Sequence, residues 1–306
     1  MQTAYKFLSS LLILLFSLSL SSQDFDLIKI RSAYYPSQSI EDSSVDGEVG
    51  FFVWNGTVMV PQVFKNKKTI LTHRASYSNL RVDTKANLMS DPIEVNRHYH
   101  TISYNLGLIQ SLNPKWRLML NLNPTIASDL ESSLTEDDFL YQANAVVVNN
   151  KSKKLSYGFG LAFTTRFGRQ LILPTGMVRY RTPKMDLNVL LPTVASIMFK
   201  SKSQTFLYGF EASINGALFN NTSDVETITT AIDETGYSRF LLGPALELRL
   251  QNGVKVQANG GVAVGRRLEF IDVNEEIFDR APEVGPFFSL GLSFSPKKDK
   301  AEKSSK

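Results

Sequence analysis

Apolar and polar residues alternate along most of this chain, between residues 48 and 295. The run from Trp116 to Asn123 shows the pattern clearly, and Leu155 to Thr164 and Phe288 to Phe294 repeat it. A period of two places successive side chains on opposite faces of a sheet, so each run predicts a strand with one apolar face. The alternation therefore predicts an all-β fold.

The first residues have the features of a secretion signal. Lys6 supplies a positive charge, an apolar segment runs from Phe7 to Leu20, and Ser19 and Ser21 form a small-x-small cleavage pattern. We expect a signal peptide over residues 1–22, with an N-terminal membrane anchor as the alternative.

Long alternating strands behind a secretion signal predict a transmembrane β-barrel over residues 23–295. The mean hydropathy of −0.10 argues against a helical membrane protein. After the N-terminus, no stretch approaches the roughly 20 apolar residues that a spanning helix needs. A barrel meets lipid with only every second residue, so it needs no such stretch.

Composition excludes several classes of protein. The chain has no cysteine, which excludes thiolate zinc sites, cysteine nucleophiles and a lipid anchor on cysteine. The net charge of +4 is modest, and five lysines lie in residues 296–306, which we interpret as a basic, disordered tail. We expect no nucleic-acid partner and no cofactor.

The lengths of the connections limit the number of strands. Outer-membrane barrels have short periplasmic turns and longer outer loops, with both termini in the periplasm, so the strand number is even. Short turns fall at 64–68, 113–115, 149–153, 182–184, 201–203 and 251–253. Long polar loops fall at 36–47, 83–96, 128–138, 220–236 and 274–285.

Alternation of long and short connections requires two short strands on either side of Pro192-Thr193, which gives an antiparallel barrel of about 14 strands. A barrel of 12 strands is the alternative. The predicted strands are 26–35, 48–61, 69–82, 98–111, 116–127, 139–148, 154–167, 170–181, 185–191, 194–200, 204–218, 237–250, 254–271 and 286–295.

The chain resembles the uncharacterised outer-membrane β-barrel families of Gram-negative bacteria, which are filed as domains of unknown function. The features that carry the resemblance are the signal peptide, the Asn-Pro-Lys-Trp hairpin at 113–116, the paired Leu-Pro-Thr hairpins at 173–175 and 191–193, and the final strand from Phe287 to Phe294. The resemblance implies an outer-membrane location, with outer-membrane lipid and the barrel-assembly machinery as partners, and implies no catalytic residues.

The phase of the alternation predicts which side chains face the lumen. The expected lumen-lining residues are mostly basic, and a ring of arginines favours anions in a water-filled pore. Mutual pairing of these charges in a structural network is the alternative. The set is Arg117, Arg166, Arg179, Arg181, Arg239, Glu247, Arg249 and Lys255.

Two histidines are the main candidates for chemistry. His98 and His100 share one face of a strand, but their phase places them outward, so we expect no metal site. A lipid-modifying enzyme that uses one of them, with Ser76 or Ser78 on the adjacent strand, is a remaining alternative.

The sequence favours a passive outer-membrane pore or transporter with a weakly basic lumen and no enzymatic activity. The second possibility is a plugged, non-conducting barrel whose outer loops bind or anchor a partner, with the loop at 220–236 as the contact. The transported solute does not follow from the sequence.

Overall fold

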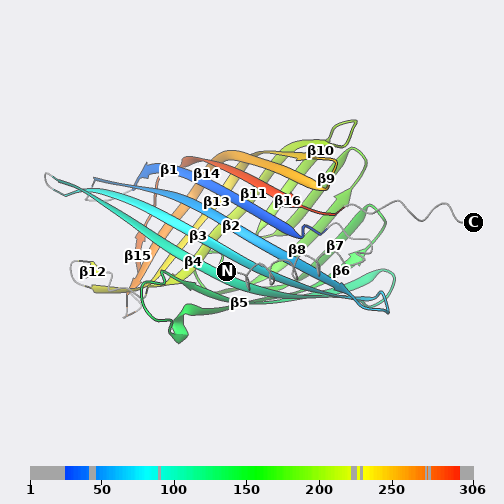
Figure 1. Ribbon diagram of the computed structural model, residues 1–306, viewed down its shortest axis with the longest axis horizontal. Coiled ribbons are helices and arrows are strands. Elements are labelled where there is room, and N and C mark those ends of the chain that lie inside the picture. Colours follow the sequence, from blue (N-terminus) through cyan, green and yellow to red (C-terminus); the bar gives the residue numbers. More distant parts are fainter. Residues whose placement is uncertain are drawn as a thin grey trace, which may run out of the picture.

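The computed structural model describes residues 25–40, 46–88, 91–221, 226–227, 230–272, 274 and 277–296. These residues form a closed, antiparallel β-barrel of 14 strands, which are strongly tilted (Figure 1). The ring closes where β1 pairs with β16, so that Ile28 lies opposite Phe294 and Tyr34 lies opposite Phe288. The predicted signal peptide and all but the first residue of the predicted tail lie outside the described residues.

The barrel strands are β1 (Ile28–Ser39), β2 (Asp46–Val63), β3 (Thr69–Leu88), β4 (Asp91–Ser111), β5 (Trp116–Ser128), β6 (Phe139–Asn150), β7 (Leu155–Thr164), β8 (Leu171–Arg181), β9 (Met185–Leu191), β10 (Val194–Lys200), β11 (Phe206–Asn220), β13 (Thr230–Arg249), β14 (Val254–Asp272) and β16 (Gly285–Phe294). Two further strands, β12 (Glu226–Thr227) and β15 (Ile277–Arg280), lie together at one end of the barrel (Figure 1). One short helix, η1 (Glu136–Asp138), precedes β6. No helix in the described parts of the chain is long and apolar enough to cross a membrane.

The strand count of 14 is confirmed, and the 12-strand alternative is wrong. The deciding segment is 185–200, which forms two strands of seven residues joined at Pro192 and Thr193. Thr193 N–H donates to the Leu190 carbonyl at 2.8 Å, which closes this tight turn. Counting by the parity of the connections succeeds because antiparallel neighbours must be joined alternately at the two ends.

The structure differs from the sequence-based boundaries in several places, and β13 begins at Thr230, so residues 230–236 of a predicted loop are strand. The polar segment 83–96 is not a loop, because β3 and β4 stay paired as far as Leu88 opposite Asp91. The predicted strand 154–167 ends at Thr164, so Arg166 lies in the connection between β7 and β8. Pairing of the backbone satisfies its polar groups whether or not the side chains are apolar, so a hairpin can continue into polar sequence.

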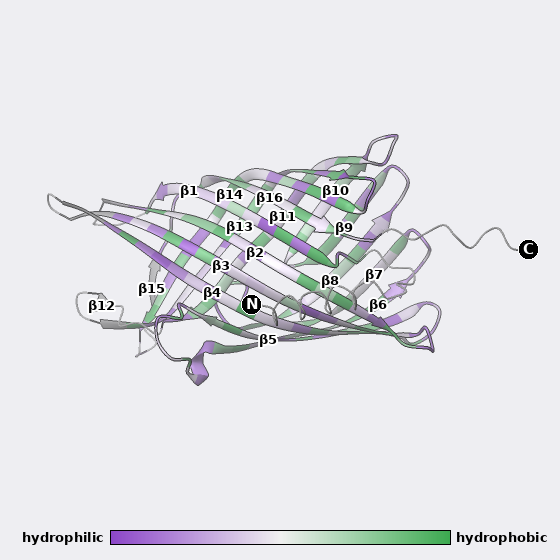
Figure 2. Ribbon diagram, in the orientation of Figure 1, coloured by the Kyte–Doolittle hydropathy of each residue, from purple (hydrophilic) through white to green (hydrophobic). Residues whose placement is uncertain are grey.

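The two faces of the wall differ in polarity. Outward side chains of β13 and β16 are large, apolar and exposed, and include Phe240, Leu242, Leu246, Phe288 and Leu290. Figure 2 shows the alternation of apolar and polar residues along the strands. An exposed apolar outer face is what a barrel presents to hydrocarbon.

The wall is incomplete on one side because β9 and β10 are so short. β10 pairs with β11 only as far as Val194 opposite Ser213, whereas β13 pairs with β11 along its whole length, from Phe206 to Asn220. At its end Asn220 forms a parallel bridge with Ser128 of β5, which is not a neighbour of β11 in the barrel order. The end of β11 stays paired with β13 as far as Asn220 opposite Glu234, so this part of the wall meets β5 across the interior at the long-loop end.

Single cysteines on β13 test the assignment of the two faces, since the chain has no other cysteine. We expect Arg249→Cys to react with a water-soluble maleimide in lipid vesicles, because this side chain faces the interior. Leu248→Cys, one residue away, is expected to resist that reagent and to respond to a lipid-confined nitroxide quencher. The opposite pattern of reactivity would invert the faces.

Candidate functional site

The interior of the barrel is filled with apolar side chains at the long-loop end. Buried residues from ten strands form one hydrophobic core there, and six of them are aromatic. We call these six residues the aromatic plug: Tyr35, Phe51, Tyr99, Phe219, Tyr237 and Phe287. Aromatic rings supply much of the apolar area that a core buries, so these six residues account for much of the packing at this end.

Contacts within the plug connect strands that are not neighbours in the wall. The rings of Tyr99 on β4 and Phe219 on β11 lie 4.9 Å apart. The hydroxyl of Tyr99 donates to Oγ1 of Thr235 on β13 at 3.2 Å. The ring of Phe51 on β2 lies 6.2 Å from that of Tyr237 on β13. Such contacts can form only across the interior, so the opposite walls meet.

Arg239 is buried inside the plug, with 2% of its surface exposed. Its guanidinium carbon lies 3.6 Å from the ring centroid of Tyr35 and 4.8 Å from those of Phe51 and Tyr237. Its Nε and Nη2 donate to Oδ1 of Asn215 at 3.2 and 3.1 Å. Among the described residues no carboxylate pairs with it, so the π-faces offset much of the cost of burying the charge.

A second arginine approaches the same rings. Arg266 on β14 is 4% exposed, and its guanidinium carbon lies 5.4 Å from the centroid of Phe51. Its Nη1 donates to the carbonyl of Glu283 at 3.1 Å, and its Nη2 donates to the carbonyl of Val49 at 3.5 Å. Two buried guanidiniums thus contact one ring, and carbonyl oxygens hold one of them in place.

The connection between β7 and β8 covers the segment of β11 that β10 does not reach. A Cβ on Gly216 would lie 2.4 Å from the carbonyl oxygen of Arg166, and one on Gly236 would lie 2.5 Å from that of Gly168. Only glycine permits this approach of backbone to backbone. Arg169 in the same connection forms a bidentate ion pair with the buried Glu269 of β14, at 2.9 and 2.7 Å.

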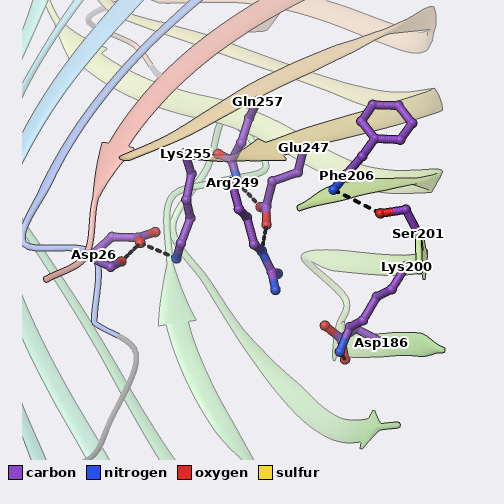
Figure 3. Close-up of polar contacts among 10 residues, drawn as sticks. Asp26, Asp186, Lys200, Ser201, Phe206, Glu247, Arg249, Lys255 and Gln257 are labelled. Atoms are coloured by element: carbon purple, nitrogen blue, oxygen red, sulfur yellow. Dashed lines mark hydrogen bonds and ion pairs between the residues drawn. The ribbon is translucent and has the colours of Figure 1, made fainter. Parts of the chain in front are cut away.

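The interior at the short-turn end is polar and charged. The ammonium of Lys255 contacts Asp26 at 2.8 Å, and Ser295 also donates to Asp26. Nε of Arg249 contacts Glu247 at 2.6 Å, and Glu247 accepts a bond from Gln257 at 2.8 Å. Lys200 contacts Asp186 at 2.7 Å. Figure 3 shows Asp26 beside Lys255, Glu247 beside Arg249, and Asp186 beside Lys200.

The eight residues expected to line the lumen therefore have different surroundings. Glu247, Arg249 and Lys255 lie in the charged network at the short-turn end, whereas Arg239 lies in the plug and Arg166 in a connection. By strand register, Arg117, Arg179 and Arg181 share the inward phase, and all three are exposed.

Sequence reasoning missed the aromatic plug and Arg266. The available signal was apolar residues on both phases of one strand, as in Phe51-Phe52-Val53-Trp54, and again in Leu218-Phe219. Such runs are typical of strands that are buried on both faces. A prediction from alternation assigns the apolar phase to lipid and the other phase to the lumen, so it does not identify apolar residues on the inner phase.

The arrangement of histidine and serine that a hydrolase would need is not formed. Nδ1 of His100 bonds to the hydroxyl of Tyr77 at 2.8 Å on the outward face. Ser76 and Ser78 occupy the opposite phase of β3, where Ser76 hydrogen-bonds Thr57 at 3.2 Å. Within the described residues no three His, Cys, Asp or Glu side chains are placed to hold a metal ion.

Comparison with known proteins confirms the resemblance to an uncharacterised outer-membrane barrel family. A family model described as "Domain of unknown function (DUF6268)" matches residues 59–295. No curated protein matches the chain.

Solved structures with a similar fold include outer-membrane barrels of several kinds. The NanC porin is 8% identical, with 88% of this chain and 99% of that chain covered and a TM-score of 0.37. LpxR from Salmonella typhimurium is 7% identical, with coverages of 88% and 99% and a TM-score of 0.32. The outer membrane protease OmpT from Escherichia coli is 8% identical, with coverages of 88% and 94% and a TM-score of 0.22. At these identities the likeness concerns the fold alone.

We expected from the sequence that this chain has no enzymatic activity, and that expectation is wrong. Barrels with this general fold include a porin and a protease, so the fold does not exclude catalysis.

A double-mutant cycle tests the contact between Arg239 and the plug. We expect Arg239→Gln and Tyr35→Leu to be coupled by about 1–2 kcal/mol in the free energy of unfolding, because each removes the same cation–π contact. Urea unfolding in lipid vesicles, followed by tryptophan fluorescence, measures this energy. The control cycle of Arg239→Gln with the outward Phe288→Leu should give a coupling below about 0.5 kcal/mol, and equal coupling in both cycles would contradict the assignment.

Proposed function

We propose that this chain, which belongs to the family described as "Domain of unknown function (DUF6268)", is an outer-membrane barrel that is closed at its outer mouth and does not conduct solutes passively. Of the two main readings of the sequence, this is the plugged barrel rather than the open pore. The aromatic plug is the observation that carries the proposal.

The orientation of the barrel follows from its connections. Outer-membrane barrels have their short turns and both termini on the periplasmic side. Here β1 begins and β16 ends beside the turn 250–253, which is one of the short turns. We therefore place the short-turn end in the periplasm and the aromatic plug towards the cell exterior. Location in the outer membrane, after removal of the signal peptide, is part of the proposal.

Three features support closure at the outer end. The plug brings opposite walls into contact through Tyr99 and Phe219. The end of β11 reaches β5, where Asp129 N–H donates to the Asn220 carbonyl at 3.3 Å and the Asn220 amide donates to Asp138 at 3.1 Å. Arg169 fastens the β7–β8 connection to Glu269. An open pore would need all three to move.

A closed barrel acts through the surfaces that it leaves accessible. On the outer side these are the loops, and binding of a partner by the segment 220–236 remains a prediction, since part of it lies outside the described residues. Contacts with outer-membrane lipid and with the barrel-assembly machinery also remain predictions.

Recording in planar bilayers tests the proposal. We expect no discrete current steps from the purified wild-type barrel. The double variant Phe219→Ala/Tyr237→Ala should produce steps, because it removes two rings of the plug. Heat-modifiable gel migration establishes that each protein recorded is a folded barrel.

The matched control is Phe240→Ala/Leu242→Ala, which removes two outward side chains from the same strand as Tyr237. This variant should stay silent. Discrete steps from the wild-type protein would overturn the proposal, and silence from a folded plug variant would show that the plug is not the barrier.

A further inference from the structure

The inner face of the barrel at the short-turn end has more cations than carboxylates. Four carboxylates lie there, namely Asp26, Asp186, Glu211 and Glu247, and each has a cation within 4.0 Å. Their partners are Arg31, Lys200, Arg249 and Lys255. The carboxylates of this region are therefore already neutralised.

Five further cations point inward near this end without a carboxylate within 4.0 Å among the described residues: Lys29, Arg74, Arg117, Arg179 and Arg181. We call them the free inner cations. Strand register fixes their direction. Lys29 lies opposite Thr57, and Arg74 lies opposite Met59 and Asn105, all on the inward phase.

Water reaches these charges. Arg74, Arg117, Arg179 and Arg181 are exposed, although all four lie on the inner face of a closed ring of strands. Cations on the inner face of a low-dielectric wall produce a positive potential inside it, which raises the local concentration of anions. Guanidinium groups also bind phosphate and carboxylate through paired hydrogen bonds, which gives selectivity in addition to charge.

The short turns extend the same charge to the rim of this end. The turns 64–68, 112–115, 151–154, 182–184 and 201–205 each contain at least one lysine, and none contains Asp or Glu. An anion that approaches this end therefore meets positive charge before it reaches the interior. Beyond the free inner cations, the aromatic plug closes the way through.

We propose that the inner face at the periplasmic end is a dead-end binding site for a soluble ligand with two or more phosphate or carboxylate groups, which enters from the periplasm. The inference rests on the closed barrel of the proposed function. Arg117, Arg179 and Arg181 form the core of the site, because they are exposed, unpaired and on the inner phase of β5 and β8.

Calorimetric titration of the detergent-solubilised full-length chain with pyrophosphate tests the site. Chloride at matched ionic strength corrects for general screening, and citrate in a parallel titration shows whether carboxylate or phosphate is preferred. We expect saturable binding of at least one of the two. The triple variant Arg117→Gln/Arg179→Gln/Arg181→Gln should weaken it by about tenfold or more, because it removes the charge-assisted hydrogen bonds.

The control is Arg81→Gln/Lys85→Gln/Arg97→Gln, which removes the same charge from β3 and β4 near the opposite, long-loop end. It should weaken binding by less than about threefold, since exposed charges are screened. An equal loss in both variants, or no saturable binding by the wild-type protein, would overturn the inference. The planar-bilayer recordings and the binding titration test different claims. A wild-type barrel that conducts but still binds pyrophosphate or citrate refutes closure alone. A wild-type barrel that is silent and does not bind refutes only the binding site.

Discussion

Closure of the backbone hydrogen bonds is the constraint on which this structure depends. Hydrocarbon offers no partner for an N–H or a C=O group, so a sheet that crosses a membrane must have no free edge. The pairing of β1 with β16 meets this condition, and Lys255 and Ser295 fasten the start of β1 through Asp26. The closed ring then gives every strand one face towards lipid and one towards the interior.

The weakest part of the wall determines the form of the interior. β9 and β10 are too short to support the full length of β8 and β11. Beyond Ser213, β11 has no pairing with β10, although it stays paired with β13; Asn220 bridges to Ser128 of β5, and the β7–β8 connection approaches the backbone at Gly216. In this same part of β11, Phe219 lies against Tyr99, so the aromatic plug lies where the short hairpin leaves the wall incomplete.

The same barrel therefore has two different interiors. Towards the long loops, aromatic rings surround Arg239, and cation–π contacts take the place of a carboxylate partner. Towards the short turns, arginines face water without partners, which requires hydration and hence space. The basic lumen expected from the sequence is thus divided into a part buried among aromatic rings and a part whose arginines are exposed.

The sequence by itself determined the fold class and the number of strands. A period of two is a local property, and the parity of long and short connections is readable along the chain, as the pair 185–191 and 194–200 shows. Only the tertiary structure decided what the inward side chains meet. Arg239 and Arg249 have the same phase on one strand, yet one is buried among rings and the other pairs with Glu247. The difference arises from contacts between strands far apart in sequence, such as β2 with β13 and β5 with β11, which no local pattern encodes.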